Sequence, residues 1–226
     1  MPLDDNPILG AEQRRFLAAF ARSPLAWRYY LTGGTALAAF HLQHRLSDDL
    51  DLFAEEPAPI EELLAFLREH GFPRPDYQHV FDRRIFLLHR PDGSLKVEFT
   101  RYPFPRLETG LLVEGLRIDS LCDILANKLV ALTDRSEPKD LVDLYVALRE
   151  RPDLDLDRLI DDAEGKFGVQ GVRHILRGRF LAELPPLGVL EMRKAFEPAA
   201  MQEFFSAAGR RWVRRAVEGE PGGRRS

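Results

Sequence analysis

The sequence lacks the features that mark secreted, membrane-spanning and zinc-stabilised proteins. It contains a single cysteine, Cys122, which excludes an intramolecular disulfide and a cysteine-rich zinc site. It has no apolar run long enough to cross a bilayer, and its opening residues, MPLDDNPILG, are acidic, unlike a signal peptide. We therefore expect a soluble cytoplasmic protein that makes no membrane contact.

A surplus of positive charge is also missing. The 226 residues carry a net charge of −4, with 45% apolar and 30% charged residues, which is ordinary for a globular protein. A chain of this length can bury a substantial core, as one large domain or two small ones. Because the chain is not basic throughout, any contact with nucleic acid must depend on a local basic patch.

Hydrophobic periodicity divides the chain near residue 118. Before this point, helical spacing alternates with short period-two or aromatic runs that are typical of strands. The expected helices there are 11–23, 35–44 and 58–72, and the expected strands are 27–32, 49–53, 83–90 and 94–102, with edge strands in 111–119. Periodicity alone leaves open whether the strands 27–32 and 49–53 run parallel or antiparallel.

After residue 118 the strand signals vanish and helical spacing continues to the tail. The expected helices are 120–134, 137–150, 156–167, 169–184 and a last one from Pro198. We therefore expect residues 1–118 to form a mixed α/β (α+β) domain and residues 119–226 an all-helical one. The ending, EGEPGGRRS, is expected to be disordered.

Two aspartates interrupt an apolar run. In the stretch DDLDLF, Asp49 and Asp51 alternate with leucines. Residues i and i+2 of a strand project from the same face, about 7 Å apart. Two ionised carboxylates this close repel each other, and a divalent cation such as Mg²⁺ or Mn²⁺ would remove that cost. The alternative is a strand end whose acids face water or pair with Arg45.

A pair of glycines precedes the aspartates by one short helix. Gly33 and Gly34 follow the first expected strand, and glycine lets the backbone adopt positive φ and approach a ligand closely. A helix start favours anions, and Thr35 adds a hydroxyl. Although a Gly-Gly pair is also an ordinary turn, we interpret this one as a candidate phosphate site. Arg45 could clamp the same phosphate, next to Ser47, or only balance the acids.

Glu98 is a candidate third carboxylate. In the stretch SLKVEFT, Glu98 alternates with Val97 and Phe99. If these two apolar residues face the core, Glu98 projects from the other face of its strand, where it could join the two aspartates around a metal. The alternative is a surface hairpin on which Lys96 and Glu98 form only a charge pattern.

The helical half contains its own group of charged residues. In NKLVALTDRSEPKDLVDLY, Lys128 and Arg135 are spaced to share a helix face, and Asp140 begins the next helix with Asp143 one turn later. These residues could tie two helices together by ion pairs, which contribute little at a surface. Alternatively, Lys128 contacts a phosphate while Asp140 orients it or acts on an acceptor.

The best candidate for a basic patch is the segment AAGRRWVRRAVEG near the C-terminus. At helical spacing its arginines form two adjacent rows beside a tryptophan; they are Arg210, Arg211, Arg214 and Arg215, with Trp212. The tryptophan would either stack on a base or pack on the core, and packing is slightly favoured. A weaker patch contains Arg177 and Arg179.

Two of these stretches resemble the motifs of one known family. GGTALAAFHLQHRLSDDLDLF closely resembles the signature of the AbiEii-type abortive-infection toxins, a branch of the polymerase-β-like nucleotidyltransferase superfamily. NKLVALTDRSEPKDLVDLY resembles the downstream motif of the same family. The two motifs span Gly33 to Tyr145; the later helices carry no matching signature.

The resemblance implies a fold, a reaction and a set of residues. The fold would be a mixed sheet with flanking helices in a catalytic domain, followed by a helical part that closes a nucleotide cleft. The reaction would transfer a nucleoside monophosphate from an NTP to an acceptor with Mg²⁺ (or Mn²⁺), releasing pyrophosphate. The implied nucleotide-binding residues are Gly33, Gly34, Thr35, Arg45 and Ser47, the catalytic residues are Asp49, Asp51, Lys128 and Asp140, and the metal ligands are Asp49, Asp51 and Glu98.

The resemblance also implies partners. The acceptor would be the 3′ end of tRNA, and an antitoxin encoded by a neighbouring gene would neutralise the toxin. Two other interpretations stay open from the residues alone: an enzyme of the same fold that modifies a protein hydroxyl or a small molecule, and a catalytically silent nucleotide-binding module.

Overall fold

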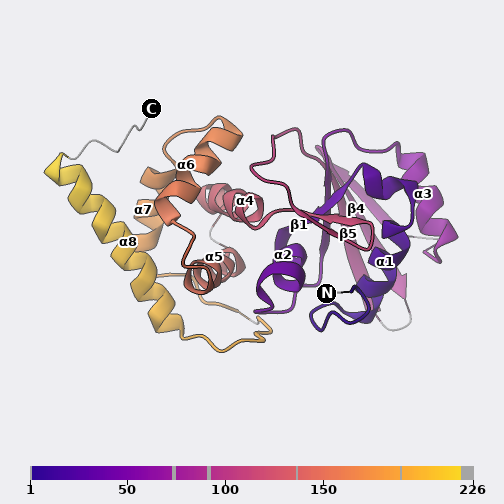
Figure 1. Ribbon diagram of the computed structural model, residues 1–226, viewed down its shortest axis with the longest axis horizontal. Helices are drawn as coiled ribbons and strands as arrows, with labels where there is room; N and C mark the ends of the chain where they lie inside the picture. The colour runs from indigo at the N-terminus through magenta and orange to yellow at the C-terminus, as the bar shows by residue number, and fades with distance from the viewer. Residues whose placement is uncertain (1, 73–74, 91–92, 136, 189, 220–226) are drawn as a thin grey trace. The chain divides into compact units, whose positions relative to one another are not determined.

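The computed structural model describes residues 2–72, 75–90, 93–135, 137–188 and 190–219. The chain forms two compact units (Figure 1): Met1–Ile124 with Glu191–Lys194, and Leu125–Leu190 with Ala195–Ser226. The mixed α/β fold with a helical C-terminal part, expected from the periodicity, is confirmed. In the described parts of the chain, no helix is both long and apolar enough to cross a bilayer.

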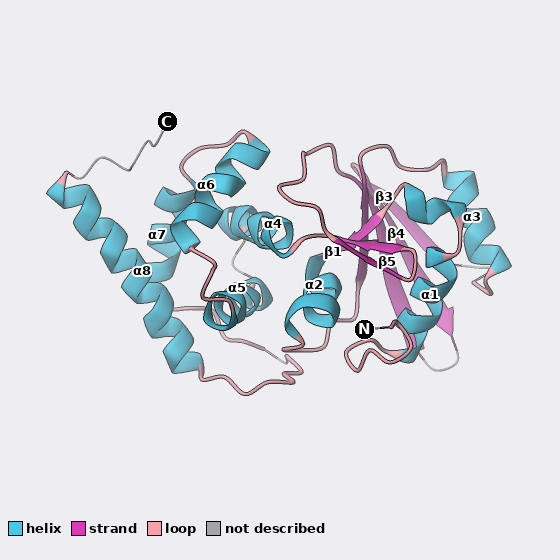
Figure 2. Cartoon of the chain, viewed as in Figure 1, coloured by secondary structure: helices cyan, strands magenta, loops and turns pink. Residues whose placement is uncertain are grey.

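A mixed sheet forms the centre of the first unit (Figure 2). Its strands are β1 (Tyr30–Thr32), β2 (Leu50–Ala54), β3 (Asp76–Val80), β4 (Arg83–Arg90), β5 (Gly93–Arg101), β6 (Leu111–Val113) and β7 (Leu116–Ile118). Among the described residues their order is β3-β4-β5-β2-β1-β7-β6. β1 runs antiparallel to β2 and parallel to β7, and β2 runs parallel to β5. The antiparallel alternative for the first two predicted strands is therefore correct.

Two predictions differ from the observed strands. The expected first strand starts only at Tyr30, because Pro24–Trp27 forms the short 3-10 helix η1, which Pro24 begins. The edge strand β3 was not expected at all. All its residues are exposed, so no apolar alternation marks it in the sequence.

Helices cover both faces of the sheet. The first unit contains α1 (Ala11–Ala21), α2 (Gly33–Ala36), which continues into the π-helical turn η2 (Leu37–Leu42), and α3 (Ile60–Glu69). Figure 2 shows α1 and α3 on one side of the sheet and α2 on the other. Phe16 and Phe20 of α1 pack against Phe66 of α3. Phe20 also meets the sheet at Phe99, with ring centroids 6.0 Å apart. This aromatic layer is the core of the first unit.

The alternation of β2 and β5 leaves the acids on the face opposite that core. Leu50 and Leu52 are fully buried, so Asp51 projects from the other side of β2. Val97 and Phe99 of β5 are buried, as the sequence predicts. Because Asp51 pairs with Glu98 in the ladder, both carboxylates lie on the same face.

The second unit is helical. Its helices are α4 (Leu121–Asp134), which begins in the first unit, α5 (Pro138–Glu150), α6 (Leu156–Phe167), α7 (Val172–Leu181) and α8 (Pro198–Glu218). Phe180 of α7 packs against Phe205 and Trp212 of α8, with ring centroids 4.5 and 5.6 Å apart. Ser120 caps α4, its hydroxyl accepting the Asp123 N–H at 3.0 Å. Of the predicted disordered tail, residues 220–226 lie outside the described residues.

A short segment before α8 returns to the first unit. The Leu46 N–H donates to the Glu191 carbonyl, and the Arg193 N–H donates to the His44 carbonyl, both at 2.8 Å. Arg45 and Met192 form the β-bridge between these bonds. The segment 191–194 therefore braces the backbone that leads into β2.

Candidate active site

The glycine turn lies directly against the carboxylate of Asp51. Gly33 adopts a φ of +71°, and a Cβ added there would stand 2.0 Å from Asp51 Oδ2. No side chain fits in that space, and the positive φ would strain any L-residue. Only glycine therefore brings the backbone at the start of α2 beside this aspartate.

The second glycine lies against two more of the predicted residues. A Cβ at Gly34 would stand 2.8 Å from Arg45 Nη2 and 2.9 Å from Ser47 Oγ. Arg45 is 3% exposed, and its Nη1 donates to the Leu46 carbonyl at 2.8 Å. The structure thus brings together Gly33 and Gly34 with Arg45, Ser47 and Asp51, as the motif spacing predicts. The assignment of these residues to nucleotide binding stays a prediction.

Thr35 holds the aspartate segment in place. It is buried, and its hydroxyl donates to the Asp49 carbonyl at 2.5 Å and to the Ser47 carbonyl at 3.3 Å. The Gln13 amide adds hydrogen bonds to the Ser47 and Asp48 carbonyls at 2.7 and 3.1 Å. A direct contact of Thr35 with a triphosphate stays a prediction. Gln13 was not among the predicted site residues, because nothing in the sequence of α1 indicates that it contacts a distant loop.

The three predicted acids surround two cations. Lys96 Nζ lies 3.0 Å from Asp49 Oδ2 and 4.0 Å from Glu98 Oε2. Arg83 donates to both Glu98 oxygens, with Nη2 2.7 Å from Oε2. This hydrogen bonding raises the pKa of Arg83 against the opposing effect of burial, and the charge of Asp51 adds to the increase. Glu98 is only 4% exposed, so the alternative of a solvated charge pattern does not describe it.

Asp49 and Asp51 have the ligand chemistry of a magnesium site. In the described part of the chain, no three His, Cys, Asp or Glu side chains form a ready metal cage. Mg²⁺ is usually held by one or two carboxylates together with substrate phosphates, and two aspartates beside a glycine turn fit that pattern. Glu98 fits less well, because its carboxylate already accepts hydrogen bonds from Arg83 and Thr100.

The second unit brings Lys128 and Asp140 together. Lys128 Nζ lies 2.7 Å from both Asp140 Oδ1 and Asp143 Oδ2, and all three side chains are buried. Burial alone would lower the pKa of Lys128, but Asp143 and Asp140 raise it above its ordinary value. Arg135 lies 3.4 Å from the other Asp140 oxygen. Asp143 was not assigned to the site, although its position one turn after Asp140 was the available signal.

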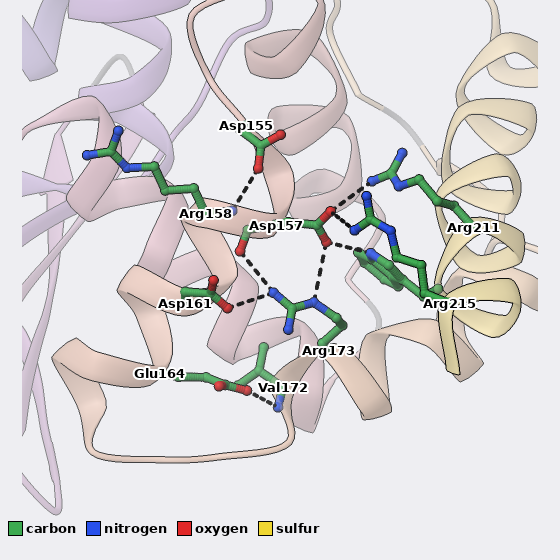
Figure 3. Close-up of polar contacts among 10 residues, drawn as sticks. Asp155, Asp157, Arg158, Asp161, Glu164, Val172, Arg173, Arg211 and Arg215 are labelled. Carbon is green, nitrogen blue, oxygen red and sulfur yellow. Dashed lines mark hydrogen bonds and ion pairs between the residues drawn. The ribbon is translucent and has the colours of Figure 1, made fainter. Parts of the chain in front are cut away.

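Three of the four α8 arginines pair with carboxylates, and Figure 3 shows Arg211 and Arg215 with Asp157. Asp157 of α6 accepts the indole N–H of Trp212 at 2.5 Å and pairs with Arg211 and Arg215 at 3.4 and 3.0 Å. Arg210 pairs with Glu203 at 2.5 Å. Trp212 itself is 4% exposed and stacks on a buried phenylalanine. Packing on the core, the alternative slightly favoured for this residue, is confirmed.

One curated protein and two solved structures are similar to this chain. Over 150 residues it is 32% identical to an uncharacterized protein of Aquifex aeolicus (strain VF5), covering 63% of this chain and 68% of that protein. The crystal structure of JHP933 from Helicobacter pylori has the same fold, with a TM-score of 0.56, 18% identity and coverage of 91% of this chain and 90% of the other. A second H. pylori crystal structure, of a proposed nucleotidyltransferase, matches with the same score and identity over 94% and 100%.

The match to a family extends over most of the sequence. Residues 15–221 match the family described as "Nucleotidyl transferase AbiEii toxin, Type IV TA system". The matched range contains the glycine turn, the three acids and the Lys128 cluster. The chain therefore belongs to the AbiEii nucleotidyltransferase toxins of type IV toxin–antitoxin systems, as its two motifs predict.

Proposed function

We propose that this nucleotidyltransferase toxin transfers a nucleoside monophosphate from an NTP to the 3′ end of tRNA, with Mg²⁺ or Mn²⁺ as cofactor. The observation that carries the proposal is the direct apposition of Gly33 and Asp51. It puts the backbone of a glycine turn, suited to phosphate, beside a carboxylate suited to a divalent cation. An NTP with its metal is the common cellular ligand that combines these two chemistries.

The triphosphate is assigned to the glycine turn. The backbone of Gly33 lies beside the Asp51 carboxylate, and the Arg45 guanidinium lies against Gly34. A buried guanidinium binds phosphate oxygens strongly and is always charged. The Ser47 hydroxyl is the remaining polar group at this turn.

The metal is assigned to Asp49 and Asp51. When bound, Mg²⁺ would neutralise charge on the phosphates and lower the pKa of the attacking hydroxyl. Lys96 would have to release Asp49, which its 37% side-chain exposure permits. Arg83 would keep the charge of Glu98 compensated throughout.

The reaction forms one bond and breaks one. The acceptor hydroxyl oxygen bonds to the α-phosphorus, and the bond from that phosphorus to the departing pyrophosphate breaks. The hydroxyl proton passes to water. Lys128 and Asp140 are proposed to act in the same reaction, and their buried ion pair would have to open for either to contact substrate.

The acceptor and the cellular setting are part of the proposal. Family membership provides a nucleotide substrate and an antitoxin partner. We assign the acceptor to tRNA and the neutralising protein to a neighbouring gene, and we place the reaction in the cytoplasm, where NTPs and tRNA are abundant. Support from a basic surface is limited, since three of the four α8 arginines pair with carboxylates.

Incubation of the purified protein with total tRNA, Mg²⁺ and each radiolabelled NTP in turn tests this function. The label should enter tRNA with wild-type protein and not with Asp51→Ala. Asp48→Ala is the matched control, because Asp48 is the exposed neighbouring acid and should leave transfer intact. Transfer that survives Asp51→Ala would contradict the metal assignment, and label on protein or small molecules alone would replace tRNA as the acceptor.

A further inference from the structure

A run of aromatic rings lies on the same face of the sheet as the carboxylates. Tyr30 and Phe53 are cross-strand partners, next to the partners Thr32 and Asp51 on the same two strands. Since alternate residues share a face, Phe53 lies on the face of Asp51. Its ring centroid is 4.6 Å from that of Tyr102, which follows β5.

The run ends at an exposed ring. The centroid of Phe104 is 5.0 Å from that of Tyr102, and Phe104 is 38% exposed. The backbone after it is held in place, because the Asp123 carboxylate accepts the N–H groups of Leu107 and Glu108 at 2.9 and 3.1 Å. Phe104 is therefore held at the surface by a fixed backbone.

The other end of the run is fixed by charge. The Arg106 guanidinium lies 4.9 Å from the Tyr30 ring centroid and 3.3 Å from Asp119 Oδ1. Burial raises the pKa of both Tyr30 and Tyr102, so both rings stay neutral at physiological pH. These buried rings support Phe104, whose exposed ring can stack on a nucleobase.

The direction of the strands decides which nucleotide this run would meet. Gly33 follows Thr32, the partner of Asp51, and so lies toward the Asp49 end of β2, whereas Phe53 lies toward the opposite end. In phosphoryl transfer, the attacking and leaving oxygens lie roughly in line on opposite sides of the phosphorus. With the triphosphate, and hence the departing pyrophosphate, at the glycine turn, the acceptor approaches from the aromatic end.

We infer that Phe53, Tyr102 and Phe104 form a stacking site for the unpaired 3′-terminal base of an acceptor RNA. This inference rests on the proposed function and adds to it the subsite that positions the acceptor. A base stacked on Phe104 and Tyr102 would orient the terminal ribose toward Asp51. Stacking tolerates any base, so the site requires a single-stranded end and no particular sequence.

The test compares Phe104→Leu with Phe81→Leu. The substitution by leucine keeps an apolar side chain and removes the aromatic ring. Phe81 is the matched control, because it is also an exposed phenylalanine, 93% exposed in the turn between β3 and β4. The probe is a fluorescein-labelled single-stranded RNA of about ten nucleotides, within the usual range of site sizes. A second probe carries an abasic 3′-terminal nucleotide, and NTP affinity is measured separately by calorimetry.

Phe104→Leu should weaken binding of the intact RNA about tenfold, the size of one stacking contact, while Phe81→Leu and the NTP affinity stay unchanged. The abasic RNA should bind wild type and Phe104→Leu equally. If Phe104→Leu and Phe81→Leu bind the intact RNA equally well, the subsite is overturned even if tRNA is labelled. A loss of NTP affinity in Phe104→Leu that parallels its loss of RNA affinity would overturn it as well. Wild-type protein that labels only non-RNA acceptors would instead overturn the proposed function and the subsite with it.

Discussion

The backbone at Gly33 meets the carboxylate of Asp51 more closely than any other residue type allows. Gly33 and Asp51 were both found from local spacing in the sequence, because a strand, a short helix and a second strand fix their proximity over fewer than twenty residues. Their contact is therefore a property of the motif itself. The residues that compensate the acids, Lys96 and Arg83, come from later strands, and no local pattern predicts their contacts.

Gly33→Ala should abolish nucleotidyl transfer. The added Cβ would meet Asp51 Oδ2 at 2.0 Å, so either the aspartate or the glycine turn must move. Gly168→Ala is the control, because Gly168 has a similar φ of +64° and open space around its Cβ position. In urea unfolding, Gly168→Ala should lose about 1 kcal/mol of stability from the left-handed conformation, and Gly33→Ala should lose more because of the clash with Asp51. Transfer by Gly33→Ala at the wild-type rate would show that the turn does not position Asp51.

Lys96→Gln should tighten the binding of Mn²⁺. The ammonium group lies 3.0 Å from Asp49 Oδ2, where it competes with any cation. Because both side chains are partly exposed, the pair is screened, and its removal should improve metal affinity by about 1 kcal/mol, roughly fivefold. The free Mn²⁺ signal in electron paramagnetic resonance titrations measures this without reference to activity. Lys139→Gln, an exposed lysine on α5, should leave the affinity unchanged, and an equal response of both variants would refute the competition.

Single acidic residues hold whole helices together in the second unit. Asp157 of α6 binds Arg173 of α7 as well as Arg211, Trp212 and Arg215 of α8 (Figure 3). Its location explains why a row of arginines that looks like a nucleic-acid patch in the sequence is largely occupied by intramolecular pairs. The helices themselves were predictable from periodicity, but the acid that faces them was not, because it lies more than fifty residues away.

Asp157→Asn should destabilise the protein at neutral pH but not in strong acid. Burial raises the pKa of Asp157, yet Trp212 and the three arginines lower it below its ordinary value. Because the pKa of Asp157 is lower in the folded state than in the unfolded state, its ionised form stabilises the fold above the unfolded-state pKa of about 3.9. This stabilisation is lost as the pH falls through the folded-state pKa.

Chemical unfolding as a function of pH measures this dependence. At pH 7 the variant should lose about 1–2 kcal/mol, the size of a charged hydrogen-bond network that is partly exposed. The difference from wild type should shrink below pH 3.9 and vanish below the folded pKa. Asp162→Asn, which breaks a 3.9 Å pair on the exposed side of the same helix, should change stability little. If Asp157→Asn remains less stable than wild type at low pH, the cause is lost packing and not lost charge.

At the scale of the whole molecule, the sequence predicted the mixed α/β fold and its helical C-terminal part, but not every element. Periodicity distinguishes a sheet-forming half from a helical half because each element buries one face. It does not reveal β3, which buries neither face, nor the segment 191–194, which joins the first unit through backbone hydrogen bonds. Backbone hydrogen bonds require no particular side-chain pattern, so a single sequence does not predict that a distant segment such as 191–194 pairs with the first unit.

That returning segment makes the glycine-turn site depend on the distant part of the chain. The Arg193 N–H donates to the His44 carbonyl at 2.8 Å. His44 directly precedes Arg45, which forms the β-bridge with Met192, and lies three residues before Ser47. Arg193→Pro removes this donor and should cost about 0.5–1.5 kcal/mol of local stability. Because Arg45 contacts the triphosphate in the proposed function, NTP affinity should fall about threefold to tenfold.

Arg193→Ala separates the backbone from the side chain, since Arg193 is exposed and alanine keeps the N–H group. Calorimetry should give wild-type NTP affinity for Arg193→Ala and reduced affinity for Arg193→Pro, with similar urea midpoints for global unfolding. If both variants bind NTP equally well, the brace does not position Arg45. If both lose affinity, the guanidinium of Arg193 itself contacts the nucleotide, and the segment contributes to the site through its side chains.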